Sequence, residues 1–147
     1  MWELGDTFKC EPEYMNRMAP MLVDSRHLMV LVTNKYRRSS DNELVVVAAI
    51  MTYDNNTRNQ SDYCVLYPNC GHPFIKHYSY VSYISLKEIA IDTLDKWKER
   101  NYIKQKERFN EDVQKQLLQG LCKADDAENR LKLIALNQLE ELGWEVP

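Results

Sequence analysis

The sequence predicts an α+β fold that is mainly β, with a small antiparallel barrel over residues 1–100. A C-terminal helical extension over residues 101–147 is expected to pack on the barrel as part of one domain. Two observations predict this order. Short runs rich in β-branched and aromatic residues recur between polar turn signals in the first half, which is typical of small antiparallel barrels. Leucines then recur at helical spacing near the C-terminus, which indicates amphipathic helices.

The strands of the barrel are expected where apolar or alternating runs follow turn signals. The strongest signal is the valine-rich run 44–50, since β-branched residues favour strands. The expected strands are residues 7–10, 28–32, 44–50, 63–66 and 80–84. The expected loops and polar connections are residues 11–21, 34–42 and 54–62.

The second half is expected to be helical. Residues 86–94 fit either the end of a strand or a helical turn. Asn110 is expected to be an N-cap, because its side chain can accept a hydrogen bond from a free N–H of the first turn. A last helix is expected to open at Asp125 or Asp126 and to end at Gly143, because glycine is typical just after a helix C-terminus.

Composition limits the classes of function. The chain has 147 residues, of which 44% are hydrophobic, so a core can form. The net charge of −3 does not indicate a strongly basic nucleic-acid binder, although it leaves room for a local basic patch. No apolar run is long enough to span a bilayer, and the N-terminus lacks the pattern of a signal peptide. We therefore expect a soluble, cytoplasmic protein whose cysteines are free thiols.

The segment 72–80 gathers titratable and polar side chains, namely His72, Lys76, His77, Ser79 and Tyr80. Histidines that lie beside a cation suit proton transfer or anion binding. They equally suit a hairpin whose polar residues only face water. Both readings stay open at this point.

Arg26 and Thr52 are candidates at the ends of expected strands. Arg26 stands directly before the run 28–32, where a guanidinium can hold a phosphate through two hydrogen bonds. Thr52 and Asp54 follow the run 44–50, so the hydroxyl can orient a substrate oxygen and the carboxylate can act as a base. The alternatives are an ordinary flanking arginine and a turn-forming aspartate.

Metal binding and base stacking are two further possibilities. Cys64, Cys70, His72 and His77 could form a zinc site. The spacing between the two cysteines is wider than in the usual zinc motifs, so we expect no metal and no cofactor. Tyrosines beside cations can stack the bases of single-stranded nucleic acid, but they can also fill the core of a small barrel.

The order of these segments resembles the PemK/MazF group of toxin endoribonucleases, which have a compact SH3-like barrel followed by helical segments. The resemblance covers about residues 1–121. It is carried by Leu4-Gly5-Asp6-Thr7-Phe8, by the run from Arg26 to Asn34, by the run from Val45 to Thr52, and by Ser79-Tyr80-Val81 with the segment from Lys87 to Leu94. It implies an SH3-like barrel, a likeness to toxin–antitoxin modules, a homodimer and an antitoxin protein as partner.

The resemblance also implies roles for individual residues. In that family an arginine before the apolar strand and a threonine after the next strand cut single-stranded RNA without a metal, through attack by the 2′-hydroxyl. Carried over, Arg26 stabilises the phosphorane and Thr52 orients the scissile phosphate. Thr52 is displaced by one position from the family pattern, which would turn its side chain to the other face of the strand. His27 replaces the usual proline, and His27 with His77 are the acid and base candidates.

The first hypothesis is therefore a toxin-like endoribonuclease with Arg26, Thr52 and His77 as catalytic residues. Its expected substrate-binding residues are His27, Asp54, His72, Lys76, Ser79 and Tyr80. The alternatives are a catalytically inactive SH3-like module that binds protein or nucleic acid, and a zinc-stabilised structural domain. Arg26 and a histidine in one concave groove would favour the enzyme. A groove that holds tyrosines without clustered cations would favour the inactive module.

Overall fold

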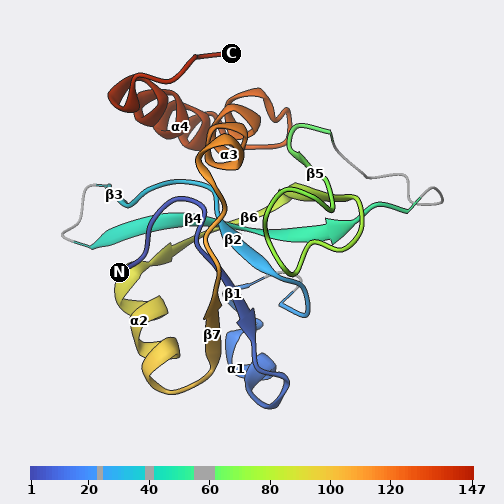
Figure 1. Ribbon diagram of the computed structural model, residues 1–147. Helices are drawn as coiled ribbons and strands as arrows, with labels where there is room; N and C mark the ends of the chain where they lie inside the picture. The colour runs from blue at the N-terminus through green and yellow to red at the C-terminus, as the bar shows by residue number, and fades with distance from the viewer. Residues whose placement is uncertain (23–24, 39–41, 55–61) are drawn as a thin grey trace.

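The computed structural model describes residues 1–22, 25–38, 42–54 and 62–147, which form a mixed α+β fold around one curled antiparallel sheet (Figure 1). The order of strands across the sheet is β5-β6-β4-β2-β1-β7, and β3 pairs with the start of β4. The strands are β1 (Thr7–Cys10), β2 (Met29–Leu31), β3 (Tyr36–Arg37), β4 (Glu43–Thr52), β5 (Val65–Leu66), β6 (Ser79–Ala90) and β7 (Ile103–Lys106).

The helices lie in two groups on either side of the sheet in Figure 1. The short 3₁₀ helix η1 (Pro12–Tyr14), α1 (Met15–Met18) and α2 (Ile91–Glu99) form one group. The other group is α3 (Glu111–Lys123) and α4 (Asn129–Leu142), which pack on each other. Among the described residues, no helix is both long and apolar enough to cross a membrane.

Strand β4 separates two hydrophobic cores. Its side chains alternate between faces, as in any strand, and both faces are covered. Val46, Ala48 and Ile50 point into the core beneath α3 and α4. Val45 and its alternate neighbours point into the opposite core, which contains the side chains of Trp2, Phe8, Met18, Leu94 and Trp97. Burial on both faces explains why this strand reads as a continuous apolar run.

Helix α3 approaches the sheet closely at Gly120. A Cβ atom on Gly120 would lie 2.5 Å from the hydroxyl of Tyr83 on β6. That hydroxyl donates a hydrogen bond of 2.9 Å to the backbone oxygen of Leu117 in the same helix. The helix begins at the expected cap, where the Asn110 side chain accepts a hydrogen bond of 3.1 Å from Val113 N–H.

Helix α4 is tied to the sheet by a carboxylate on β6. The guanidinium of Arg130 donates to both oxygens of Glu88, at 2.6 and 2.9 Å. The hydroxyl of Tyr36 on β3 donates to the same carboxylate. At the other end of the helix, the side chain of Gln138 exchanges two hydrogen bonds with the backbone of Asn34. These contacts fix α4 against the edge where β3 pairs with β4.

Every expected strand run contains a strand, and the predicted cap at Asn110 and glycine end at Gly143 are confirmed. The α+β class with a mainly antiparallel sheet is therefore supported. Three expectations are wrong. Residues 11–21 are not a loop, because Pro12 starts η1 and Met18 of α1 is buried in a core. Residues 103–106, expected in the helical extension, are strand β7. The last helix begins at Asn129 and not at Asp125 or Asp126.

Segment 86–94, which fitted either the end of a strand or a helical turn, contains the end of β6 and the start of α2. Strand β6 continues to Ala90, because it pairs with β4 almost from end to end, and α2 starts at Ile91. The polar connection 34–42 contains the two-residue strand β3. Of the expected turn 54–62, residues 55–61 lie outside the described part of the chain.

Candidate active site

The ends of β2, β4 and β6 meet at one side of the sheet and bring three expected site residues together. Thr52, the last residue of β4, pairs with Ser79, the first residue of β6. On the other side of β4, Ile50 N–H donates to the backbone oxygen of Leu28 at 2.9 Å. This bond extends the pairing of β2 with β4 toward the turn at Arg26. Arg26, Thr52 and Ser79 therefore come from three adjacent segments of one sheet.

A small cavity of about 170 Å³ lies at this point, and we call it the Arg26 cavity. Its polar lining is Lys9, Arg26, His27, Thr52 and Ser79, and its apolar lining is Leu28, Ile50, Phe74 and Ile75. The cavity lining thus combines two cationic side chains, a histidine, two hydroxyl-bearing residues and four apolar side chains. That combination can bind an oxyanion and exchange a proton with it.

Thr52 lines the same cavity as Arg26, so its displacement in the sequence does not put it out of reach. The reason is the alternation along β4. Thr52 is two residues beyond Ile50 and shares its face, and Ile50 is the residue that bonds to Leu28. The displacement by one position therefore still leaves Thr52 in the lining of the cavity that contains Arg26.

Arg26 is exposed, and its turn is held by a lysine of β1. The ammonium of Lys9 donates a hydrogen bond of 2.8 Å to the backbone oxygen of Arg26. Among the described residues, the guanidinium of Arg26 forms no ion pair. A guanidinium without a carboxylate partner keeps its donors for an anionic ligand.

A larger hollow of about 720 Å³ adjoins the Arg26 cavity, and Thr52 lines both. We call it the tyrosine hollow. Its lining is Thr52, Tyr53, Val65, Tyr67, Pro68, Lys76, His77 and Tyr78. The rings of Tyr67 and Tyr78 meet edge to face with their centroids 5.3 Å apart. This hollow holds His77 and Lys76, two of the residues expected from the sequence.

A third hollow of about 330 Å³ shares Lys9, Arg26 and Phe74 with the Arg26 cavity. We call it the lysine groove. Its lining is Lys9, Cys10, Glu11, Pro12, Met15, Arg26, Phe74, Lys104 and Lys106. Lys106 lies over the ring of Phe74, with Nζ 5.2 Å from the ring centroid. The Arg26 cavity shares Thr52 with the tyrosine hollow and shares Lys9, Arg26 and Phe74 with the lysine groove, and we call the three hollows together the path.

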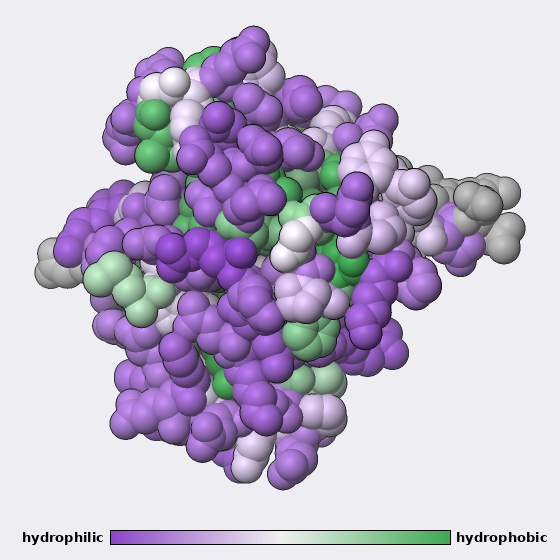
Figure 2. Space-filling model, in the orientation of Figure 1, coloured by the Kyte–Doolittle hydropathy of each residue, from purple (hydrophilic) through white to green (hydrophobic). Residues whose placement is uncertain are grey.

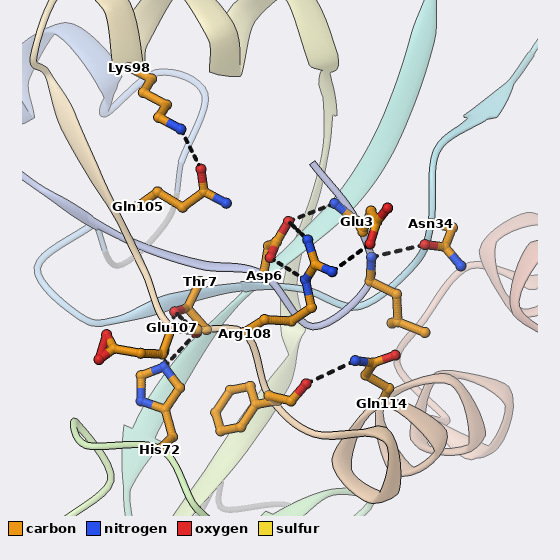
Figure 3. Close-up of polar contacts among 12 residues, drawn as sticks. Glu3, Asp6, Thr7, Asn34, His72, Lys98, Gln105, Glu107, Arg108 and Gln114 are labelled. Atoms are coloured by element: carbon orange, nitrogen blue, oxygen red, sulfur yellow. Dashed lines mark hydrogen bonds and ion pairs between the residues drawn. The ribbon is translucent and has the colours of Figure 1, made fainter. Parts of the chain in front are cut away.

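His72 lies in a buried position behind this path, with 4% of its surface exposed. Phe74 N–H donates to Nδ1 of His72 at 3.2 Å, so the proton of the neutral ring is on Nε2. That nitrogen lies 2.8 Å from the backbone oxygen of Glu107 and 3.0 Å from Thr7 Oγ1 (Figure 3). Burial lowers the pKa of His72, against the smaller opposing effect of the Glu107 carbonyl.

His72 is therefore a structural anchor and does not line any of the three hollows. It ties the segment that carries Phe74 to β1 and to the connection between β7 and α3. A second anchor lies nearby in Figure 3, where the guanidinium of Arg108 donates to Asp6 at 2.7 Å. The first anchor joins Thr7 of β1 to His72, 65 positions later, and the second joins Asp6, just before β1, to Arg108, 102 positions later.

Two other expected binding residues also lie outside the path. Tyr80 is buried, and its ring packs against Tyr53 with centroids 5.1 Å apart. Asp54 is exposed and does not line the three hollows. Ser79 does line the Arg26 cavity, although its hydroxyl donates to the backbone oxygen of His77 at 2.9 Å.

No family model, curated protein or solved structure matches the chain.

The four residues considered for zinc do not come together as a site. Cys64 is buried in the core beneath α3, and burial raises the pKa of its thiol to about 12. Such a thiol resists the deprotonation that zinc binding requires. Within the described ranges, no three His, Cys, Asp or Glu side chains are close enough to hold a metal ion.

Sequence reasoning missed the lysines of the path. Lys9 is on β1, and Lys104 and Lys106 are on β7, which pairs with β1 in antiparallel register. No short-range pattern links residues so far apart in the sequence. One pattern in the sequence could have indicated Lys9. It stands between the apolar residues Phe8 and Cys10, which are buried, so its side chain lies on the opposite face of β1.

Proposed function

We propose that the chain is an endoribonuclease that cleaves single-stranded RNA at the Arg26 cavity without a metal, on an SH3-like barrel of the PemK/MazF type. The observation that carries the proposal is that Arg26, His27 and Thr52 line one cavity. A cation and a histidine in one concave site favour an enzyme over an inactive module. The clustering of further lysines on the path suits a polyanionic substrate, despite the net charge of −3.

The reaction needs no group that the chain does not supply. The 2′-oxygen of one ribose attacks the adjacent phosphorus, so a new P–O2′ bond forms while the P–O5′ bond breaks. A base removes the proton of the 2′-hydroxyl, and an acid gives a proton to the departing 5′-oxygen. The products are a 2′,3′-cyclic phosphate and a 5′-hydroxyl end.

Arg26 is assigned to the charge that develops on the phosphate. Its guanidinium can donate two parallel hydrogen bonds to the non-bridging oxygens, which gain charge in the transition state. The Thr52 hydroxyl can donate to the same phosphate from the end of β4. Thr52 is paired at the end of β4 and the backbone of Arg26 is held by Lys9, so both residues are anchored before the substrate arrives.

His27 and His77 are assigned to proton transfer. His27 lines the Arg26 cavity, and His77 lines the tyrosine hollow, which shares Thr52 with that cavity. A phosphate at Thr52 would therefore border two hollows that each contain an imidazole, and the reaction needs one base and one acid. We propose no order for the two roles.

The test is cleavage of a mixed single-stranded RNA pool by purified protein in the presence of a chelator. We expect cuts with 5′-hydroxyl ends, and a loss of about 100-fold or more in Arg26→Ala, as for the removal of one oxyanion donor. Arg100→Ala is the matched control, since Arg100 is an exposed arginine that lines none of the three hollows. His27→Ala and His77→Ala identify the proton-transfer residues.

Two results would remove the proposal. One is the absence of cutting by protein that is folded by circular dichroism. The other is equal cutting by Arg26→Ala and the unchanged chain. Binding of RNA without cutting would instead favour the catalytically inactive binding module. The homodimer and the antitoxin partner belong to the same proposal, and light scattering of the purified chain tests the dimer.

A further inference from the structure

We propose that the tyrosine hollow is a base-binding subsite, which takes the nucleotide next to the phosphate held at Arg26 and stacks its base on Tyr67 and Tyr78. The inference rests on the proposed function and names how that site binds the nucleotide beside the reacting phosphate. Its volume of about 720 Å³ lies within the range of ligand pockets. Its shared lining residue, Thr52, joins it directly to the Arg26 cavity.

The two tyrosines are more exposed than structural aromatics need to be. Tyr67 is 53% exposed and Tyr78 is 57% exposed, although the rings contact each other. The rings meet edge to face at an angle of 82°, and in that arrangement two aromatic rings do not cover each other's faces fully; both residues line the hollow. Open aromatic faces at a surface bind the faces of nucleobases, and this stacking is tolerant of base identity.

The charges of the hollow suit the same ligand. Lys76 and His77 line it beside the tyrosines, and no carboxylate of the described residues does so. A nucleotide offers both an aromatic ring and a phosphate, so it can use the ring faces and the cation at once. The path then continues through Arg26 to Lys104 and Lys106, which suits a chain of phosphates.

A protein ligand fits the hollow less well, because Val65 and Pro68 are the only aliphatic side chains among its described lining residues. On the face drawn in Figure 2, hydrophilic residues predominate and apolar residues show mainly in the gaps between them. Protein interfaces usually present a more continuous apolar centre. The combination of tyrosines with a cationic path is instead the pattern of single-strand binding sites.

Binding is measured by fluorescence anisotropy with labelled 2′-O-methyl RNA hexamers of A, C, G or U, which the proposed reaction cannot cut. We expect Tyr67→Ala and Tyr78→Ala to weaken binding by about 10-fold each, as for the loss of one stacked base. Tyr67→Phe and Tyr78→Phe keep the ring and should bind within about 2-fold of the unchanged chain. Tyr14→Ala is the control, because Tyr14 also packs on a second tyrosine but lines none of the three hollows.

Both substitutions are at half-exposed side chains, so thermal unfolding should show that the variants remain folded. Alanine variants that bind hexamers as well as the unchanged chain would overturn the subsite. So would phenylalanine variants that lose as much as alanine, since the ring would then not be the binding element. A folded chain that binds no hexamer at low salt would also overturn it.

Cleavage of the RNA pool by the same variants separates the two proposals. If cutting depends on Arg26 but binding does not depend on the tyrosines, the proposal of the subsite is rejected and the proposal of a ribonuclease stands. If binding depends on the tyrosines but neither the unchanged chain nor any variant cuts RNA, the proposal of a ribonuclease is rejected. The placement of the subsite next to a cleaved phosphate is then rejected with it. If both proposals hold, Tyr67→Ala and Tyr78→Ala will raise the KM of RNA cleavage to a similar degree for all sequences, while Arg26→Ala will abolish cutting.

Discussion

The side chain of Lys9 donates a hydrogen bond of 2.8 Å to the backbone oxygen of Arg26. The lysine belongs to β1, whereas the arginine lies in the turn that precedes β2. The same ammonium lines the Arg26 cavity, so it both positions the turn and adds a positive charge to the site. The placement of the arginine thus depends on a residue that the resemblance does not mention.

Replacement of Lys9 should reveal this positioning role. Lys9→Met keeps most of the aliphatic stem but removes the donor and the charge. We expect the kcat of RNA cleavage to fall by about 10- to 100-fold, because misplacement of a catalytic group by about 1 Å has effects of this size. Lys9→Arg should recover part of the loss. Unchanged kcat with a raised KM would show that Lys9 only attracts RNA and does not position Arg26.

Loss of the Glu88 carboxylate should loosen α4. Hydrogen bonds from Arg130 and Tyr36 lower the pKa of Glu88, with the Arg130 contribution the larger, against the opposing effect of burial. Glu88→Gln should therefore reduce the free energy of unfolding at pH 7 by about 1–3 kcal/mol. Urea denaturation measures the change. Glu128→Gln is the control, since Glu128 contacts the same arginine from a 70% exposed position and should cost little.

The carboxylate of Glu88 should also make the stability of the protein depend on pH. Its pKa is lower in the folded than in the unfolded chain, so the unfolded chain takes up a proton first as the pH falls. The stability that Glu88 contributes is complete above the unfolded value near 4.5 and is lost as the pH falls through the folded value. Between pH 6 and pH 3, Glu88→Gln should lose less stability than the unchanged chain.

His72 should give a separate dependence at higher pH. Its pKa is lowered by burial below the ordinary value of 6.5, so the unfolded chain binds the proton more readily. Stability is therefore complete above about pH 6.5 and falls as the pH drops toward the folded value. His72→Gln should show a smaller loss between pH 7.5 and pH 5.5 in urea denaturation. His77→Gln, at an exposed histidine, is the control. If it reduced the loss of stability as much as His72→Gln does, the assignment to His72 would be contradicted.

An alanine at position 120 should destabilise the protein although it lies in a helix. Glycine to alanine in an open helix gains about 1 kcal/mol. Here the new Cβ would lie 2.5 Å from the hydroxyl oxygen of Tyr83, so the helix or the ring must move. We expect Gly120→Ala to cost about 1–3 kcal/mol, as for overpacked cores. In a Tyr83→Phe background the cost should be smaller, and a double-mutant cycle would measure the difference.

Local signals in the sequence predicted the elements better than their pairing. Valine-rich runs, the cap at Asn110 and the glycine at Gly143 act within a few residues, and each appears in the structure as expected. The division of 86–94 between β6 and α2 could not be predicted, because the pairing of β6 with β4 decides where the strand ends. Strand β7 was missed for the same reason, since its partner β1 is near the other end of the chain.

The residues of the site likewise divide into those that local sequence indicated and those that only long-range packing or pairing decides. Arg26, Thr52, His27, Lys76, His77 and Ser79 were candidates from the sequence, and the structure brings them to one path. His72 and Tyr80 carry the same chemical groups but are turned into the protein by their packing. The lysines of β1 and β7 join the path only through long-range pairing, so no spacing rule could have found them.

The pairing of β1 with β7 also bears on how the protein is made. Thr7 pairs with Lys106, so β1 cannot form this pairing until the ribosome has synthesised almost a hundred further residues. Chains emerge at about 5–20 residues per second and fold from the N-terminus where they can. The lysine groove has its full lining only after β7 has emerged. A nascent or prematurely ended chain therefore carries Arg26 without the complete groove around it, so any activity at this site arises only late in translation.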